Sequence, residues 1–203
     1  MTKVLKVIIV SWLLGLPLVG FGQIYHAGSS VPATREKTAN WDISLGGYLT
    51  YTQVVDPAGE VLFSREKSLN ARGLYYVTPW LAAGVEGAWA QHRNFPTQNT
   101  YHHKRYGLVT KWVLTPQTTP RVYLLAGGGT SRREISYTSG WWREQIKKPY
   151  WTIGGGLEMG IGRWGYLGLE TQALYNEHRK LDAFSALNNR WEIEVGLRAG
   201  VRF

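Results

Sequence analysis

The closing segment Trp191–Phe203 constrains the fold more than any other part of the sequence. Its odd-numbered residues are all apolar, and its even-numbered residues are all charged or glycine. Side chains alternate between the two faces of a β-strand, so this pattern predicts a strand with one apolar face and one polar face. Most strands have about 5–6 residues, whereas a tilted strand needs about 9–11 residues to cross a bilayer. The length and the alternation therefore favour a strand that crosses a membrane.

The beginning of the chain has the layout of a secretory signal peptide. Lys3 and Lys6 precede a short apolar core, and small residues end the segment near Gly22. A transmembrane anchor is the alternative, but the apolar core is interrupted before it reaches the about 20 residues that a spanning helix needs. We expect a signal peptide over residues 1–22 with cleavage near Gly22, a periplasmic lead-in over 23–40 and a barrel domain over 41–203.

Eight segments of the predicted mature chain alternate between apolar and polar residues. They are Trp41–Gln53, Ser68–Thr78, Leu81–Gln91, Arg105–Leu114, Arg121–Thr130, Tyr150–Ile161, Tyr166–Tyr175 and Trp191–Phe203. The phase of Arg121–Thr130 stays open, because Val122–Ala126 is almost wholly apolar. The predicted fold is all-β, an eight-stranded antiparallel up-and-down transmembrane β-barrel.

The connections between these segments alternate in length. Pro79–Trp80, Thr115–Pro120 and Gly162–Gly165 are short, whereas Val54–Lys67, His92–Lys104, Ser131–Pro149 and Asn176–Arg190 are longer and polar. Short periplasmic turns and long external loops are typical of outer-membrane barrels, and tryptophans near both ends of the strands fit two interfacial girdles. A soluble lipocalin-like barrel is the structural alternative, but it would place its large apolar side chains inside.

The polar faces carry charged residues that we expect to pair inside the lumen. The interior of an eight-stranded barrel is just wide enough to be filled by side chains, and buried charges are rarely tolerated unless paired. We expect two clusters of ion pairs, one of Arg72, Glu86 and Lys111 and one of Glu158, Glu170 and Arg198. Glu158 and Glu170 could also act as an acid–base pair, but charge pairing with Arg198 explains them better. No phosphate-binding motif follows the triple glycines, and we expect no cofactor and no metal site.

The pattern, the strand count and the terminal Phe203 resemble the OmpA/OmpX-like outer-membrane β-barrel family, which includes PorT-like barrels. The resemblance implies a location in the outer membrane of a Gram-negative bacterium. It also implies that Phe203 is part of the signal that the barrel-assembly machinery reads. It implies function only in outline, because members are structural barrels, adhesins, surface-binding proteins or subunits of larger outer-membrane assemblies.

The formal net charge of +9 is concentrated in the expected outer loops. Lipopolysaccharide phosphate is the abundant anion at that surface, and nucleic acid is excluded for an exported barrel. Candidate phosphate contacts are Arg93, Lys104, Arg105, Arg143, Lys147 and Lys148, unless these loops are simply solvated.

We therefore expect a structural or surface-binding membrane barrel that is not an enzyme. The alternatives are a subunit of a larger transport or secretion assembly, with a protein partner in the outer membrane, or a narrow channel. A lipid A-modifying enzyme is disfavoured, because the His-x-Ser motif of the lipid A deacylases is missing from the sequence.

Overall fold

The computed structural model describes residues 40–55, 61–93, 100–136, 143–176, 186–187 and 191–203. The predicted signal peptide, and the lead-in up to residue 39, lie outside these ranges. Within them the chain forms nine strands: β1 (Trp41–Val55), β2 (Val61–Thr78), β3 (Leu81–Arg93), β4 (Thr100–Val113), β5 (Arg121–Ser136), β6 (Arg143–Ile161), β7 (Gly165–Asn176), β8 (Ala186–Leu187) and β9 (Trp191–Arg202). No helix in these ranges has the length and apolar character needed to span a membrane.

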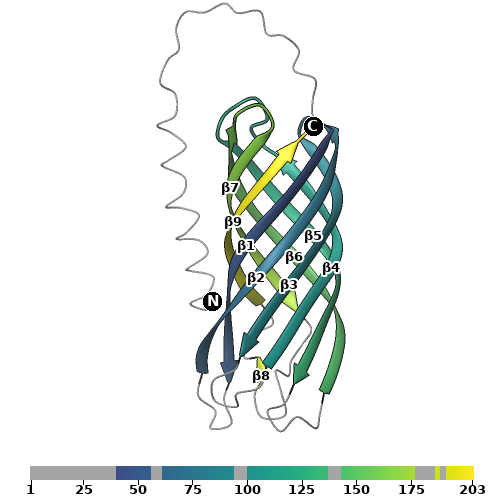
Figure 1. Cartoon of the computed structure of the whole chain (residues 1–203), viewed down its shortest axis with the longest axis vertical. Helices are drawn as coiled ribbons and strands as arrows, with labels where there is room; N and C mark the ends of the chain where they lie inside the picture. The colour runs from purple at the N-terminus through teal and green to yellow at the C-terminus, as the bar shows by residue number, and fades with distance from the viewer. Residues whose placement is uncertain (1–39, 56–60, 94–99, 137–142, 177–185, 188–190) are drawn as a thin grey trace, which may run out of the picture. The chain divides into compact units, whose positions relative to one another are not determined.

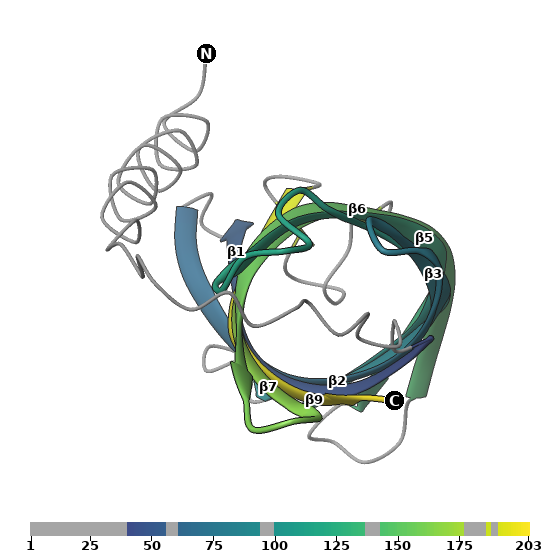
Figure 2. The same cartoon turned by 90° about the horizontal axis from the view of Figure 1, so that it is seen from above.

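Eight long strands close into one antiparallel barrel. Each of the strands β1 to β6 pairs with the next, β7 pairs with β9, and β9 returns to β1, as the closed ring of Figure 2 shows. The two-residue strand β8 pairs only with the Val54–Val55 end of β1. The strands cross the barrel at a steep tilt (Figure 1). The predicted fold class, an eight-stranded antiparallel barrel, is confirmed.

The seam between the first and last strands is fully hydrogen-bonded. The register pairs Asp42 with Arg202 and continues to Tyr51 opposite Ile193. Beyond it, the backbone N–H of Trp41 donates to the carbonyl oxygen of Phe203 at 2.9 Å, and the N–H of Phe203 donates back to Trp41 at 3.1 Å. The barrel therefore has no open edge along this seam. A lipid environment would not tolerate an open edge.

The alternation of the strands turns apolar side chains outward and polar side chains inward. Leu197 is 69% exposed, whereas its neighbour Arg198 is 1% exposed. The structure also settles the phase of β5, which the sequence left open. Tyr123 and Leu125 are buried, and Leu124 between them faces outward. The barrel is therefore inside-out relative to a soluble protein, with exposed apolar side chains around a buried polar interior.

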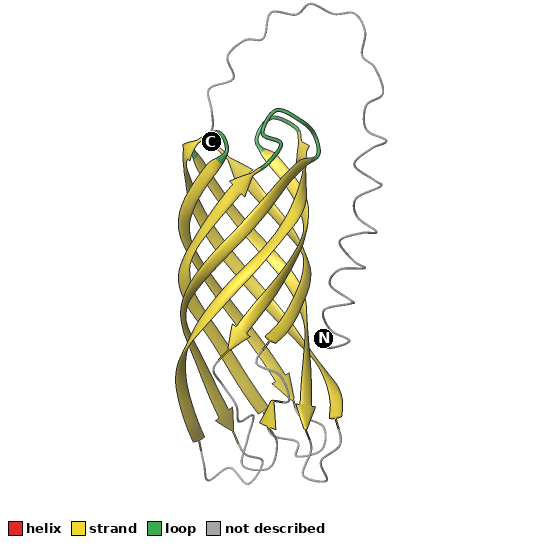
Figure 3. Cartoon of the chain, turned by 180° about the vertical axis from the view of Figure 1, so that it is seen from behind, coloured by secondary structure: helices red, strands yellow, loops and turns green. Residues whose placement is uncertain are grey.

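The two ends of the barrel differ. The short connections at 79–80, 114–120 and 162–164 lie together at one end, where Figure 3 shows the described loops in green. At the other end the strands run farther than expected. Most of Ser131–Pro149, expected as a loop, is strand, because β5 continues to Ser136 and β6 begins at Arg143. Backbone hydrogen bonds between strands do not require apolar side chains. The polar ends of the strands, beyond the part with an apolar outer face, therefore continue the β-ladder.

Lumen-facing glycines make room for tyrosine rings on neighbouring strands. A Cβ atom on Gly196 would lie 2.4 Å from the ring of Tyr48, and one on Gly200 would lie 2.5 Å from the ring of Tyr166. A side chain at either position would collide with the ring. Glycine is therefore required at these close approaches, as expected for glycine within a strand.

We predict that Gly196→Ala destabilises the barrel and that Gly47→Ala does not. The added methyl on Gly196 meets Tyr48, and overpacking of this kind costs about 1–3 kcal/mol. Gly47 faces outward with nothing within 4 Å, so its methyl meets no atom of the protein. Urea unfolding in detergent micelles, followed by tryptophan fluorescence, measures both. Equal stability of the two variants would contradict the assigned faces.

Candidate functional site: the ionic lumen

Charged side chains fill the lumen from one end to the other. The buried ones are six carboxylates and five cations: Asp42, Glu86, Glu158, Glu170, Glu192, Glu194, Arg72, Arg105, Lys111, Arg133 and Arg198. Arg202 adds a sixth cation, with its side chain 13% exposed. The charges of this described set balance, so the excess positive charge of the chain resides outside the buried lumen.

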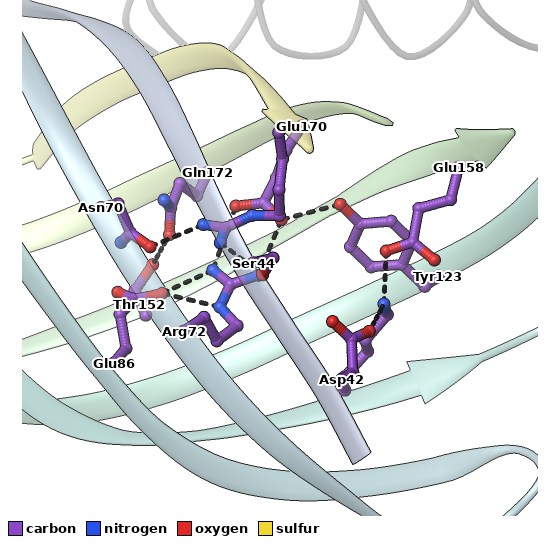
Figure 4. Close-up of polar contacts among 12 residues, drawn as sticks. Asp42, Ser44, Asn70, Arg72, Glu86, Tyr123, Thr152, Glu158, Glu170 and Gln172 are labelled. Atoms are coloured by element: carbon purple, nitrogen blue, oxygen red, sulfur yellow. Dashed lines mark hydrogen bonds and ion pairs between the residues drawn. The ribbon is translucent and has the colours of Figure 1, made fainter. Parts of the chain in front are cut away.

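Arg72 links two carboxylates at the middle of the lumen. Its Nε donates to Oε2 of Glu86 at 2.9 Å, and its Nη1 donates to Oε2 of Glu170 at 2.8 Å. Glu86 is the register partner of Arg72 on the neighbouring strand β3, whereas Glu170 reaches it from β7 across the lumen. Figure 4 shows Arg72 between the two carboxylates. One guanidinium thus holds two walls of the barrel together.

Glu170 is the most extensively bonded carboxylate of this middle cluster. Besides Arg72, it accepts hydrogen bonds from the hydroxyls of Tyr48 at 2.6 Å and Tyr123 at 2.7 Å. The Nε of Arg198 lies 3.5 Å from its Oε2. Arg198 is itself held by Tyr48, by Ser44 at 2.9 Å and by Asn70 at 2.6 Å. These bonds compensate the desolvation of both charges, which a single ion pair would not do.

A second cluster lies near the short-turn end of the barrel. Lys111 pairs with Glu158, and its Nζ lies 3.4 Å from Oδ2 of Asp42. Arg202 also contacts both carboxylates, with its Nε 3.3 Å from Oδ2 of Asp42. The hydroxyl of Tyr166 donates to Asp42 at 2.6 Å. Two carboxylates and two cations therefore neutralise one another in this described cluster.

A third group occupies the opposite end of the lumen. Nη2 of Arg105 donates to both carboxylate oxygens of Glu194, at 2.7 and 3.0 Å, and joins β4 to the opposite strand β9. Nη2 of Arg133 lies 3.5 Å from Glu192, two residues along β9. His103 Nε2 and Ser131 Oγ share a hydrogen bond of 2.6 Å. This group connects the wall of β4 and β5 to β9.

The six residues expected as lumen ion pairs all face the lumen, but their grouping differs from the expected one. Lys111 pairs with Glu158 rather than with Glu86, and Arg198 approaches Glu170 but does not pair with Glu158. The reason is reach. Long side chains cross the lumen, so residues of non-adjacent strands meet. Asp42 and Arg202 already lie on the polar faces of the first and last expected strands. Their pairing, however, could be seen only from the register of the closed barrel.

The candidate phosphate contacts are divided by the structure. Arg105 points into the lumen and is 3% exposed, so the expectation of an outer phosphate contact is corrected for this residue. Arg105 is the first residue of the expected strand Arg105–Leu114, and strand alternation turns it inward because its neighbour Tyr106 faces outward. Lys147 and Lys148 are exposed, and Lys104 is half-buried. The side chains of Arg93 and Arg143 lie outside the described part of the chain.

Among the described residues, no group of three or more His, Cys, Asp or Glu side chains is arranged to hold a metal ion. His102 and His103, which are adjacent in sequence, face opposite sides of β4, with His103 buried and His102 half-buried. The carboxylates of the lumen bind protein cations and hydroxyls. The chemistry that this site supports is therefore mutual neutralisation of buried charge.

Comparisons with known proteins show the fold. No family model and no curated protein matches the chain. Neisserial surface protein A is similar in structure, with a TM-score of 0.63, 12% identity, and coverage of 80% of this chain and 97% of that one. Ail, the attachment invasion locus protein of Yersinia pestis, has a TM-score of 0.52, 14% identity, and coverage of 81% and 99%. At these identities the likeness establishes the eight-stranded barrel architecture alone.

We predict that Arg105→Met destabilises the barrel by about 3–5 kcal/mol, because it leaves Glu194 buried without its cation. Lys104→Met is the matched control, since Lys104 is the preceding residue and points to the other face; it should change stability by about 0.5 kcal/mol or less. Urea unfolding at neutral pH measures both variants.

The double variant Arg105→Met/Glu194→Leu should recover much of the loss, because both charges leave the lumen together. Mild acid should also narrow the gap between wild type and Arg105→Met, because protonation removes the stranded charge. If Lys104→Met were the more damaging change, the inward assignment of Arg105 would be wrong.

Proposed function

We propose that the chain is an integral outer-membrane β-barrel protein with a structural or surface-binding role. The proposal rests on one observation: apolar side chains are exposed on the outside of the barrel, and the charged side chains buried in the lumen neutralise one another. Water would oppose this arrangement on the outside, and a bilayer favours it. Barrels of this architecture insert into the outer membrane of a Gram-negative bacterium. The export signal predicted for residues 1–22 fits this destination.

Two rings of tryptophan support a transmembrane position. Trp41, Trp80 and Trp164 are about half exposed near the short-turn end, and Trp89, Trp151 and Trp191 are exposed toward the other end. Indole rings prefer the interface between lipid and water. We place the short turns in the periplasm and the far ends of the strands at the cell surface, where lipopolysaccharide is the partner that we propose for the basic residues. The terminal Phe203, paired to Trp41, serves in this proposal as the signal for the barrel-assembly machinery.

The lumen supports a closed barrel rather than a channel. Arg72, Glu86, Glu170 and Arg198 meet at its middle, and each is at most 4% exposed. The bonds among these four residues would have to break for ions to pass. We propose no catalytic role, because the described carboxylates bind protein groups and the Ser131 hydroxyl is fully buried. Stable co-purification of a second outer-membrane protein would instead favour the assembly-subunit alternative.

Insertion and orientation are tested together by accessibility in whole cells. We predict that a tag in the connection 137–142 is labelled by an impermeant reagent on intact cells, whereas a tag in the turn 162–164 is labelled only after the outer membrane is opened. The folded protein should also migrate differently on gels before and after heating. Labelling of the turn alone would invert the orientation, and recovery in the soluble fraction would overturn the proposal.

Conduction gives a separate test. Purified barrel in planar bilayers should give no stable, large conductance, because side chains fill the lumen of an eight-stranded barrel. The conductance of wild type is compared with that of Arg72→Ala/Glu86→Ala, which removes two of the central side chains. Steady openings of the wild-type protein on the scale of a porin would replace the closed-barrel proposal with the channel alternative.

A further inference from the structure

Three cations form one row on the outer face of the barrel. The register pairs Lys104 on β4 with Arg132 on β5, and Arg132 with Lys147 on β6. Directly opposed residues of neighbouring strands share a face. The adjacent residues Arg105 and Arg133 are buried in the lumen, so Lys104, Arg132 and Lys147 point outward. We call these three residues the basic row.

Exposed aromatic rings lie next to the basic row on the apolar side. Trp89 is the register partner of Lys104, and Tyr106, two residues below Lys104, is 60% exposed. Trp151 is 61% exposed and lies four residues below Lys147, about 13 Å along the strand. A Cβ on Gly128 would lie 2.5 Å from the ring of Trp151, so this ring is close to the backbone of β5 at Gly128.

Small side chains separate the basic row from Trp151. Thr130 and Pro149, which are register partners of each other, are both exposed. Along the outer face, from the long-strand end toward the short-turn end, the surface therefore presents the cations first, then short side chains and then an aromatic ring. Farther down, Leu108 is 71% exposed and Ile153 is 59% exposed, as expected for contact with acyl chains.

The basic row lies on parts of β4, β5 and β6 that extend past the end of β7. The row of Trp151 continues through Tyr175 on β7 and Trp191 on β9. Strand β7 ends one residue later at Asn176, and β9 begins at Trp191. Strands β4 to β6 continue beyond this level and carry the cations. The three cations of the basic row therefore lie on strand segments that extend past the end of β7 and the start of β9.

The basic row has unused capacity for an anion. Arg132 pairs through Nη2 with Glu134 at 2.6 Å, and both side chains are partly exposed. Exposed ion pairs are weak, so an anion of higher charge can share or displace Glu134. Three cations against one carboxylate leave a net positive site.

We propose that the basic row and Tyr106, Thr130, Pro149 and Trp151 form a discrete binding site for one phosphorylated sugar headgroup of lipopolysaccharide. Phosphate binds the three cations through charge-assisted hydrogen bonds. The sugar packs against Tyr106 and the short side chains, and the acyl chains descend past Trp151. The site rests on the proposed function, since it requires the long-strand end to face the outer leaflet.

The test uses the full mature protein in phosphatidylcholine nanodiscs, with lipid A as the probe. Native mass spectrometry counts the lipid A molecules retained and gives an apparent dissociation constant. Wild type should retain one lipid A, and it should retain neither dephosphorylated lipid A nor phosphatidylglycerol to a comparable extent. Lys104→Gln/Lys147→Gln should weaken retention by about ten-fold or more, because it removes two charge-assisted contacts.

Arg65→Gln/Lys67→Gln is the matched control. Both residues are exposed cations on β2, which β3 separates from the basic row, so this variant removes the same number of charges from outside the row. It should change the dissociation constant by less than about two-fold. Equal weakening by the two variants, or equal retention of phosphatidylglycerol, would mean diffuse attraction to anionic lipid and would overturn the discrete site.

Heat-modifiable migration separates failure of the site from failure of the proposed function. A wild-type protein that does not insert and migrate as a folded barrel would refute the membrane-barrel proposal itself. A folded wild type without a preference for lipid A refutes only the site. If the double variant does not fold, Lys147→Gln alone is used, since the β6 segment that carries Lys147 has no register partner on β7 among the residues that the structure describes. It should still weaken retention more than Lys67→Gln.

Discussion

The closure of β9 onto β1 is the constraint on which the rest of the structure depends. A bilayer offers no hydrogen bonds to exposed backbone groups, so a membrane sheet must have no edge. The reciprocal bonds between Trp41 and Phe203, and the register from Asp42 to Tyr51, meet this requirement. Closure with eight strands leaves a narrow lumen. Side chains must therefore fill the lumen, and any charge that enters must find a partner there.

Charge pairing in the lumen is organised by side chains that reach across it. Arg72 bonds to both Glu86 and Glu170, and Arg105 on β4 reaches Glu194 on the opposite wall. Tyrosines complete the bonding of the carboxylates, and glycines on neighbouring strands leave space for their rings. Polar groups, rather than an apolar core, therefore connect the walls of this barrel, while apolar side chains face outward.

The sequence was sufficient to predict the strand count, the faces of most strands and the inward direction of the six expected lumen charges. Alternation is a local property, so Arg198 and Leu197 could be assigned to opposite faces from the printed sequence. Strand β5 lacked this contrast, since Val122–Ala126 offers no polar position except the amphipathic Tyr123. Its phase is set by a distant partner, because the Tyr123 hydroxyl donates to Glu170 on β7.

Partner identity could not be predicted, because it depends on the stagger of the closed barrel and on the length of arginine and lysine side chains. For the same reason Lys111 pairs with Glu158 and Asp42 instead of Glu86. Arg105 was grouped with the basic residues of the preceding connection, although the alternation of the expected strand Arg105–Leu114 places it on the inner face, opposite to Tyr106. The basic row could not be predicted either, because Arg132 joins Lys104 and Lys147 only through the cross-strand register, which is invisible along the chain.

The last strand supplies a partner at every level of the lumen. Glu192 and Glu194 meet Arg133 and Arg105, Arg198 approaches Glu170, and Arg202 contacts Asp42 and Glu158. A chain that ended before β9 would hold these groups uncompensated, beside two sheet edges without partners. Both the closed backbone pairing and the neutralisation of the lumen charges therefore depend on the last strand of the chain, so the two requirements of a closed barrel are met together by one segment.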